Sequence, residues 1–221
     1  MEAVIFDMDG VLIDTEPVSK AAFKAAFEKN GLFFDEDIYQ SLMGRSLADI
    51  MEDFTANWDA KVAEKVIADR NDYFFSYYEK RDVDIKCGIR RLLPYLKNHG
   101  YKIAVATSST QEVAEKFLKQ GGIYNYFDAY VFGSDVVHSK PNPEIFLKAA
   151  QKLGVNPSFS YVVEDAQAGL IAAHVGGFQP IFIPESALRL ELKMPFVCRR
   201  FQSASAFHLA LIQSKFEASP L

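Results

Sequence analysis

One stretch near the amino terminus decides the fold: AVIFDMDGVLIDTEP, residues 3–17. It begins with four apolar residues in a row, a pattern typical of a short strand that is buried on both faces of a parallel sheet. Two carboxylates, Asp7 and Asp9, follow at once, and Gly10 gives the backbone freedom to turn sharply behind them. The stretch therefore predicts a buried strand that ends in a pair of acidic side chains.

Further apolar runs along the chain also have the length of buried strands. They are residues 102–106, 161–163 and 180–183, with residues 130–132 as a weaker candidate. Helical patterns separate these runs, and Ser109 with Glu112 predicts a capping box at the start of one helix. Because strands and helices alternate, the predicted fold class is α/β, a Rossmann-like parallel sheet with right-handed crossovers.

A long segment between the first two strands interrupts this alternation. Residues 15–84 contain no convincing strand, but apolar residues recur there at helical spacing. The segment is too long for a crossover connection, so we expect an inserted helical cap domain. Residues 1–14 and 85–221 are then predicted to form the α/β core domain.

The composition fits an ordinary globular protein. Hydrophobic residues make up 49% of the 221 residues and charged residues 24%, so the chain should fold without disulfides or a structural metal. The formal net charge of −5 disfavours nucleic acid and anionic membranes as main partners. A small anion can still bind where local charge opposes the net charge.

The sequence also bears on the compartment. No apolar run approaches the ~18 residues that a membrane span needs, and acidic residues stand where a signal peptide would be positive. The two cysteines, Cys87 and Cys198, lie far apart and fit a reducing environment. We therefore expect a cytoplasmic monomer without a membrane partner.

Chemically active side chains follow the predicted strands where each strand ends. In chain order they are Asp7 and Asp9, Thr107 and Ser108, Lys140, and Glu164 and Asp165. Ligands of open parallel sheets bind at the carboxyl ends of the strands, so these groups should meet at one edge. Carboxylate oxygens beside an ammonium and a hydroxyl suit Mg²⁺ together with a phosphate group.

Four motifs in this order resemble those of the haloacid dehalogenase-like hydrolase superfamily, in the subfamily with a helical cap between the first two motifs. They are DMDGVLIDTEP (7–17), TSS (107–109), SKPNPEIF (139–146) and VVEDAQAGLIAA (162–173). The first and last motifs are highly specific, and the middle two support them by position. The likeness covers nearly the whole chain and is weakest from Phe196 onward.

The resemblance implies roles for the first three motifs. Asp7 is expected to be the nucleophile that takes the phosphoryl group, and Asp9 the acid that protonates the leaving oxygen and then activates water. Lys140 is expected to bind phosphate and hold the nucleophile. Thr107 matches a phosphate-binding position, although its hydroxyl also fits a helix cap, and Ser108 is expected to donate its main-chain N–H.

The resemblance also implies a Mg²⁺ site. Its expected ligands are the carboxylates of Asp7 and Asp165 and the main-chain carbonyl of Asp9. Glu164 fits either a direct ligand or a neighbour of the ligands. The implied activity is Mg²⁺-dependent hydrolysis of a small phosphorylated metabolite through an aspartyl-phosphate. Sugar phosphates are the leading candidate substrates.

Two arginines in the predicted cap are candidates to contact the part of the substrate that does not react. Arg45 lies in a turn just before a helix that Ser46 is expected to cap, and Arg70 lies in a later helix. Each also fits a charge on the protein surface. The metabolite itself stays open, because cap side chains would select it.

A phosphomutase of the beta-phosphoglucomutase type stays open as an alternative. The pattern of that enzyme has a histidine, an arginine and a Lys-Asn pair at the positions of Ser19, Leu47 and Thr110–Gln111. These departures favour a phosphatase, whereas Arg70 and Asn71 resemble a Lys-Asn pair in the cap of the mutase. A phospho-accepting receiver module is disfavoured by the acidic pair after the first strand and by the insert.

Overall fold

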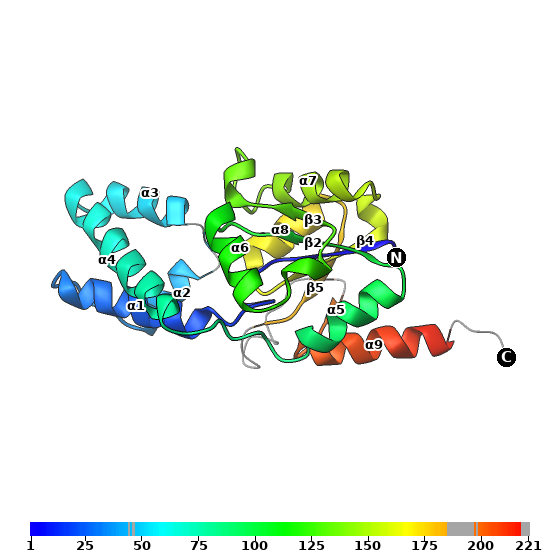
Figure 1. The fold of residues 1–221 in the computed structure, drawn as a ribbon. Coiled ribbons are helices and arrows are strands. Elements are labelled where there is room, and N and C mark those ends of the chain that lie inside the picture. The colour runs from blue at the N-terminus through cyan, green and yellow to red at the C-terminus, as the bar shows by residue number, and fades with distance from the viewer. Residues whose placement is uncertain (44, 46, 185–196, 198, 218–221) are drawn as a thin grey trace. The chain divides into compact units, whose positions relative to one another are not determined.

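The computed structural model describes residues 1–43, 45, 47–184, 197 and 199–217. These residues form a six-stranded parallel sheet with the strand order β3-β2-β1-β4-β5-β6 (Figure 1). The chain crosses from β1 outward to β3 and then returns past β1 to β4, as in a doubly wound sheet. The predicted α/β, Rossmann-like fold class is therefore confirmed.

Each predicted strand is present, with limits that differ by at most one residue at either end. The strands are β1 (Ala3–Phe6), β2 (Lys102–Ala106), β3 (Ala129–Val131), β4 (Ser160–Glu164) and β5 (Gln179–Phe182). A short edge strand, β6 (Arg199–Arg200), was not predicted, because two adjacent arginines resemble a solvated surface pair. It pairs with β5.

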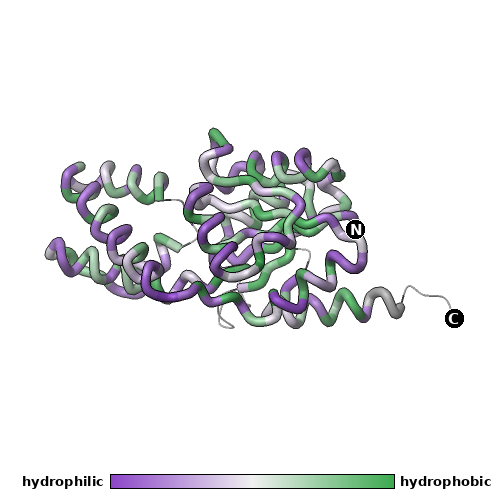
Figure 2. The backbone as a smooth tube through the Cα atoms, viewed as in Figure 1, coloured by the Kyte–Doolittle hydropathy of each residue, from purple (hydrophilic) through white to green (hydrophobic). Residues whose placement is uncertain are grey.

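Helices cover both faces of the sheet (Figure 1). They are α5 (Ile89–Asn98), α6 (Gln111–Gln120), α7 (Glu144–Leu153), α8 (Gln167–Val175) and α9 (Ala204–Glu217), with short 3₁₀ turns at Tyr124–Tyr126, Gly133–Asp135 and Pro157–Phe159. On one face, α7 and α8 pack with alternate residues of the central strands in a single apolar cluster. Figure 2 shows the strands as mainly hydrophobic and the helices as mixed, which places the core around the sheet.

The chain divides into two compact units. One comprises Met1–Asp14 with Asp84–Leu221 and contains the sheet, and the other comprises Thr15–Val83. Asp84 thus lies in the unit of the sheet, one residue from the predicted limit. Where the chain leaves and re-enters this unit, Asp14 N donates to Asp84 O at 2.8 Å and Lys86 N donates to Leu12 O at 3.0 Å.

The second unit is helical, as its apolar spacing indicates. Its helices are α1 (Glu16–Lys29), α2 (Glu36–Leu42), α3 (Leu47–Asn57) and α4 (Ala60–Glu79). Buried side chains from all four helices form one core, which includes Phe23 and Phe27 of α1 and Phe54 of α3. In the described part of the chain, no helix is long and apolar enough to cross a membrane.

Candidate active site

The site is built on the turn that follows β1. Asp7 is buried and its amide N donates to Val163 O of β4 at 3.0 Å, which continues the ladder between the two central strands. Gly10 then adopts a φ of +77°, and a Cβ atom there would lie 2.0 Å from Asp165 Oδ2. Glycine is therefore required both for the turn and for the close approach of the acidic residue that follows β4.

Lys140 joins the ends of β1 and β4 through a buried ion pair. Its Nζ lies 2.5 Å from Asp7 Oδ1 and 2.7 Å from Glu164 Oε1. The exposed fractions of the three side chains are 6%, 10% and 2% in the order Lys140, Asp7, Glu164, so water screens these charges little. The arrangement places an ammonium group directly beside the predicted nucleophile.

Burial and repulsion control the ionisation of this cluster. Burial raises the pKa of Asp7 to about 8, the carboxylates of Glu164 and Asp9 act in the same direction, and Lys140 opposes them. Burial alone would lower the pKa of Lys140, but Asp7 and Glu164 outweigh that effect and raise it above its ordinary value. Lys140 therefore stays protonated at neutral pH, while one ammonium does not fully offset the gathered carboxylates.

These carboxylates fit a divalent metal ion. Asp7, Glu164 and Asp165 each offer one oxygen, and the three oxygens lie within 4.8 Å of one another. Oxygen ligands of this kind suit Mg²⁺, and a bound cation would relieve the repulsion between carboxylates that adds to the effect of burial on the pKa of Asp7. Glu164 is also engaged otherwise, since its Oε2 accepts the amide N–H groups of Asp165 and Ala166 at 2.9 Å each.

The loop that carries Lys140 is held by a residue that the sequence analysis did not single out. Glu144, at the start of α7, accepts the amide N–H of Val137 at 3.2 Å and that of His138 at 2.9 Å, and pairs with Lys148. The Lys148 bond and the two amide bonds lower the pKa of Glu144 to about 2. This carboxylate thus fixes the loop two residues before Lys140.

We expect Glu144→Ala to lower kcat/KM for a generic aryl phosphate by about tenfold, less than the ~100-fold loss that a 1 Å misplacement can cause. The reason is that the loop would hold Lys140 less firmly against Asp7. Steady-state kinetics with Mg²⁺ would measure the loss, and Glu115→Ala is the matched control because Glu115 pairs with Lys119 within α6. Equal kinetics for Glu144→Ala and Glu115→Ala would contradict this role.

The second motif directly follows β2, and its helix cap differs from the prediction. Thr107 is fully buried, and its Oγ1 accepts the amide N–H of Ser109 at 3.1 Å, whereas Ser108 is exposed. The predicted capping box is wrong: the N-cap of α6 is Thr110, without a side-chain cap bond. Ser109 Oγ instead donates to Asp9 Oδ2 at 2.9 Å, and a carboxylate is a strong acceptor for a hydroxyl.

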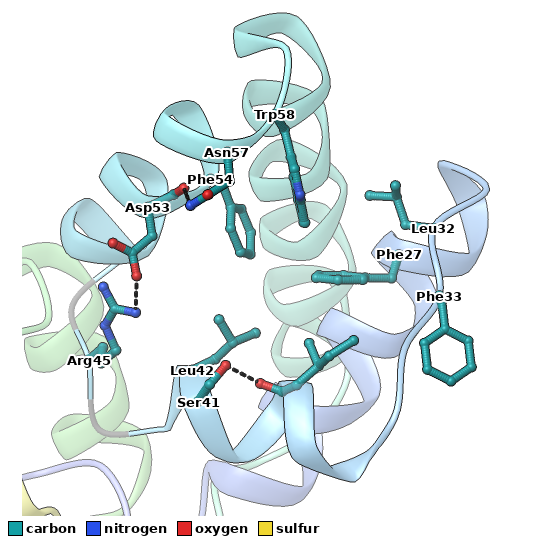
Figure 3. Close-up of a pocket in the computed structure, with 11 residues that line it drawn as sticks. Phe27, Leu32, Phe33, Ser41, Leu42, Arg45, Asp53, Phe54, Asn57 and Trp58 are labelled. Atoms are coloured by element: carbon teal, nitrogen blue, oxygen red, sulfur yellow. Dashed lines mark hydrogen bonds and ion pairs between the residues drawn. The ribbon is translucent and has the colours of Figure 1, made fainter.

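The two cap arginines have different surroundings within the helical unit. Arg45 pairs with Asp53 and donates to Asp49 O at 3.0 Å. It stands at the edge of a pocket of about 440 Å³, where Figure 3 shows Phe27 and Trp58 on the side away from Arg45. The positive charge of Arg45 is thus paired with a carboxylate of the same unit. The predicted cap residue Ser46 lies outside the described residues.

Arg70, by contrast, is buried on the inner face of α4, with 8% of its surface exposed. The guanidinium carbon lies 4.3 Å from the ring centroid of Phe74 and 5.2 Å from that of Phe23. Nη2 donates to Ser19 Oγ at 3.2 Å and Nη1 to Asn71 Oδ1 at 3.1 Å. The rings and hydrogen bonds hold this cation in one orientation, unlike a mobile surface charge.

The chain is similar to known proteins over most of its length. The family model described as haloacid dehalogenase-like hydrolase matches residues 4–183. A phosphorylated carbohydrates phosphatase of Thermotoga maritima is 36% identical over 186 residues, which cover 82% of this chain and 84% of that protein. The beta-phosphoglucomutase of Bacillus subtilis is 35% identical over 184 residues, 80% of each chain.

A solved structure gives a similar picture. The crystal structure of CbbY from Rhodobacter sphaeroides, in complex with phosphate, superposes with a TM-score of 0.78 and 25% sequence identity. The match covers 93% of this chain and 95% of that one. Both the sheet and the helical insert therefore have counterparts in a solved protein.

Proposed function

We propose that this chain, which belongs to the haloacid dehalogenase-like hydrolase family and is a phosphatase, hydrolyses small phosphomonoesters, with sugar phosphates as the leading substrate class. The proposed reaction uses Mg²⁺ and passes through an aspartyl-phosphate. The observation that carries this proposal is the buried contact of 2.5 Å between Lys140 Nζ and Asp7 Oδ1. A carboxylate that attacks a phosphate dianion meets like charge, so a neutralising cation must stand beside it. Lys140 does so.

In the proposed first step, an oxygen of Asp7 bonds to phosphorus while the bond to the ester oxygen breaks. The proton for the leaving oxygen comes from Asp9. In the second step, Asp9 takes a proton from water as the water oxygen bonds to phosphorus and Asp7 is released. Dividing one displacement into two in this way is the usual gain of covalent catalysis.

The remaining groups bind and orient. Lys140 fixes the Asp7 carboxylate through Oδ1, and we assign the phosphate to Lys140, Thr107 and the Ser108 N–H. Mg²⁺, when bound, supplies further neutralisation of phosphate charge, and we assign it to Asp7, Asp165 and the Asp9 carbonyl. Both oxygens of Glu164 have partners, which favours its role as a neighbour that orients Lys140 and Asp165.

Substrate choice is proposed to depend on the helical unit, with Arg70 as the first candidate and Arg45 as the second. Arg70 is pre-oriented by its rings and by Ser19, whereas Arg45 would have to leave Asp53 to meet an anion. A beta-phosphoglucomutase activity is the second candidate function. It is favoured by the Arg70–Asn71 bond at the position of the mutase Lys-Asn pair and disfavoured by Ser19, Leu47 and the Thr110–Gln111 pair.

A panel of phosphorylated metabolites, assayed with Mg²⁺, tests the proposal. We expect phosphate release from at least one sugar phosphate, and a fall of about 100-fold or more when the metal is chelated, since a metal ion contributes several kcal/mol. The panel includes beta-glucose 1-phosphate with a bisphosphate activator. Isomerisation of this sugar phosphate without phosphate release would contradict the phosphatase activity and support the mutase activity.

A further inference from the structure

We propose that Ser109 is a positioning residue for Asp9 and fixes the orientation in which that carboxyl meets the leaving oxygen. This inference rests on the proposed function, because it concerns the proton given to the leaving group. Ser109 Oγ lies 2.9 Å from Asp9 Oδ2, so the hydroxyl donates and the carboxyl oxygen accepts. Such a bond is about twice as strong when the acceptor is ionised.

The backbone holds Ser109 firmly in this place. Its amide N donates to Thr107 Oγ1 at 3.1 Å, and its carbonyl accepts the amide N–H of Gly133 at 3.0 Å. Gly133 can approach this closely because it lacks a side chain, since a Cβ atom there would lie 2.3 Å from Ser108 O. The segments that follow β2 and β3 thus both fix the serine that meets Asp9.

The chemistry follows from the atoms involved. Because Ser109 holds Oδ2, the orientation of the Asp9 carboxyl is fixed. As the P–O ester bond breaks, its electron pair stays with the leaving oxygen, and that oxygen takes a proton from the Asp9 carboxyl. Asp9 becomes ionised in this step, so the Ser109 bond strengthens as the transition state forms. Ser109 should therefore matter most for leaving groups that need a proton.

Two aryl esters separate this role from a structural one. The nitrophenolate of p-nitrophenyl phosphate leaves readily as an anion, whereas the phenolate of phenyl phosphate is a poorer leaving group that needs a proton more. We expect Ser109→Ala to lower kcat/KM for phenyl phosphate by about 10- to 100-fold, part of the usual gain from general acid–base catalysis. For p-nitrophenyl phosphate we expect a loss of less than about 3-fold, because little proton transfer is required.

A matched pair of variants isolates the hydroxyl. Ser109→Thr keeps it and should retain most of the activity on phenyl phosphate, whereas the similarly shaped Ser109→Val should behave like Ser109→Ala. Thr110→Ala is the control, since the exposed side chain of Thr110 makes no cap bond and should not affect either ester. Melting temperatures, measured for every variant, show whether each one is folded.

A double variant tests whether Ser109 acts through Asp9. Asp9→Asn with Ser109→Ala should cleave phenyl phosphate no more slowly than Asp9→Asn alone, because interacting residues are not additive. Equal losses on both esters, or additive losses in the double variant, would overturn the role of Ser109. Activity that survives Asp7→Asn, or wild-type protein that releases phosphate from neither aryl ester nor any sugar phosphate, would instead overturn the proposed function and this inference with it.

Discussion

The Asp7→Asn variant is expected to release phosphate from a generic aryl phosphate at least about 10⁴-fold more slowly than the wild-type protein, because an amide oxygen is a poor nucleophile. The substitution keeps the shape of the side chain, removes its ionisable group and replaces one carboxyl oxygen by an NH₂ group. Lys140 keeps Glu164 as a partner at 2.7 Å, so the ammonium is not left alone. The loss should therefore be chemical rather than structural.

Stability gives a second readout for the same variant. Burial raises the pKa of Asp7 from 3.8 to about 8, so its ionisation costs more in the folded chain than in the unfolded one. The stability that its protonated form provides is complete below the ordinary pKa and is lost as pH rises toward about 8. Without Mg²⁺, we expect Asp7→Asn to melt no lower than the wild-type protein near pH 8.

Asp82→Asn, which changes an exposed carboxylate, is the control for Asp7→Asn and should keep wild-type activity. Phosphate release near the wild-type rate by folded Asp7→Asn protein would show that another group is the nucleophile. A folded but inactive Asp7→Asn protein beside an active Asp82→Asn protein supports the assignment.

The strands and the edge that carries the site could be predicted from the sequence for a simple reason. Runs such as residues 3–6 are apolar on both faces, and parallel strands bring their carboxyl ends to one edge, so groups far apart in the sequence converge. The contact of Lys140 with Asp7, 133 residues away, follows from that topology. The tight turn at Gly10 was also predictable, since only glycine readily adopts its φ.

The features that could not be predicted depend on which of several available hydrogen-bond or packing partners a side chain contacts in the folded chain. Ser109 has a residue type that often caps helices, and nothing local shows that Asp9 would take its hydroxyl instead. Glu144 resembles any acidic residue in the first turn of a helix, yet it accepts two loop amides. Arg70 resembles a surface charge until the rings of Phe23 and Phe74 are placed around it.

Lys140→Met is expected to produce the second large effect, a fall in kcat/KM of at least about 10³-fold, comparable to the loss of a major electrostatic donor to a transition state. Methionine retains much of the length of the side chain, but it loses the contact of the ammonium with the ring of Phe146, whose centroid lies 4.9 Å from Nζ. The variant removes the ammonium while filling much of its space, so the change reports on charge.

The same variant should be less stable, and more so at high pH. Removing one member of a buried ion pair typically costs ~3–5 kcal/mol, and here two buried carboxylates, Asp7 and Glu164, lose their shared partner. Lys140 opposes the effects of burial and of Glu164 on the pKa of Asp7, so its loss should raise that pKa further. A carboxyl with a raised pKa loses stability as pH rises. The difference in melting temperature from wild type should therefore grow between about pH 5 and about pH 8.

The control for this prediction is Lys119→Met, which removes an exposed lysine paired with Glu115 along α6. Surface pairs of this kind contribute little, so its melting temperature and kinetics should stay close to wild type at both pH values. Added Mg²⁺ should narrow the stability gap of Lys140→Met, because a cation bound by the same carboxylates replaces part of the lost positive charge. A gap that is the same at both pH values and with Mg²⁺ would mean that Lys140 supports the fold through packing rather than through its charge.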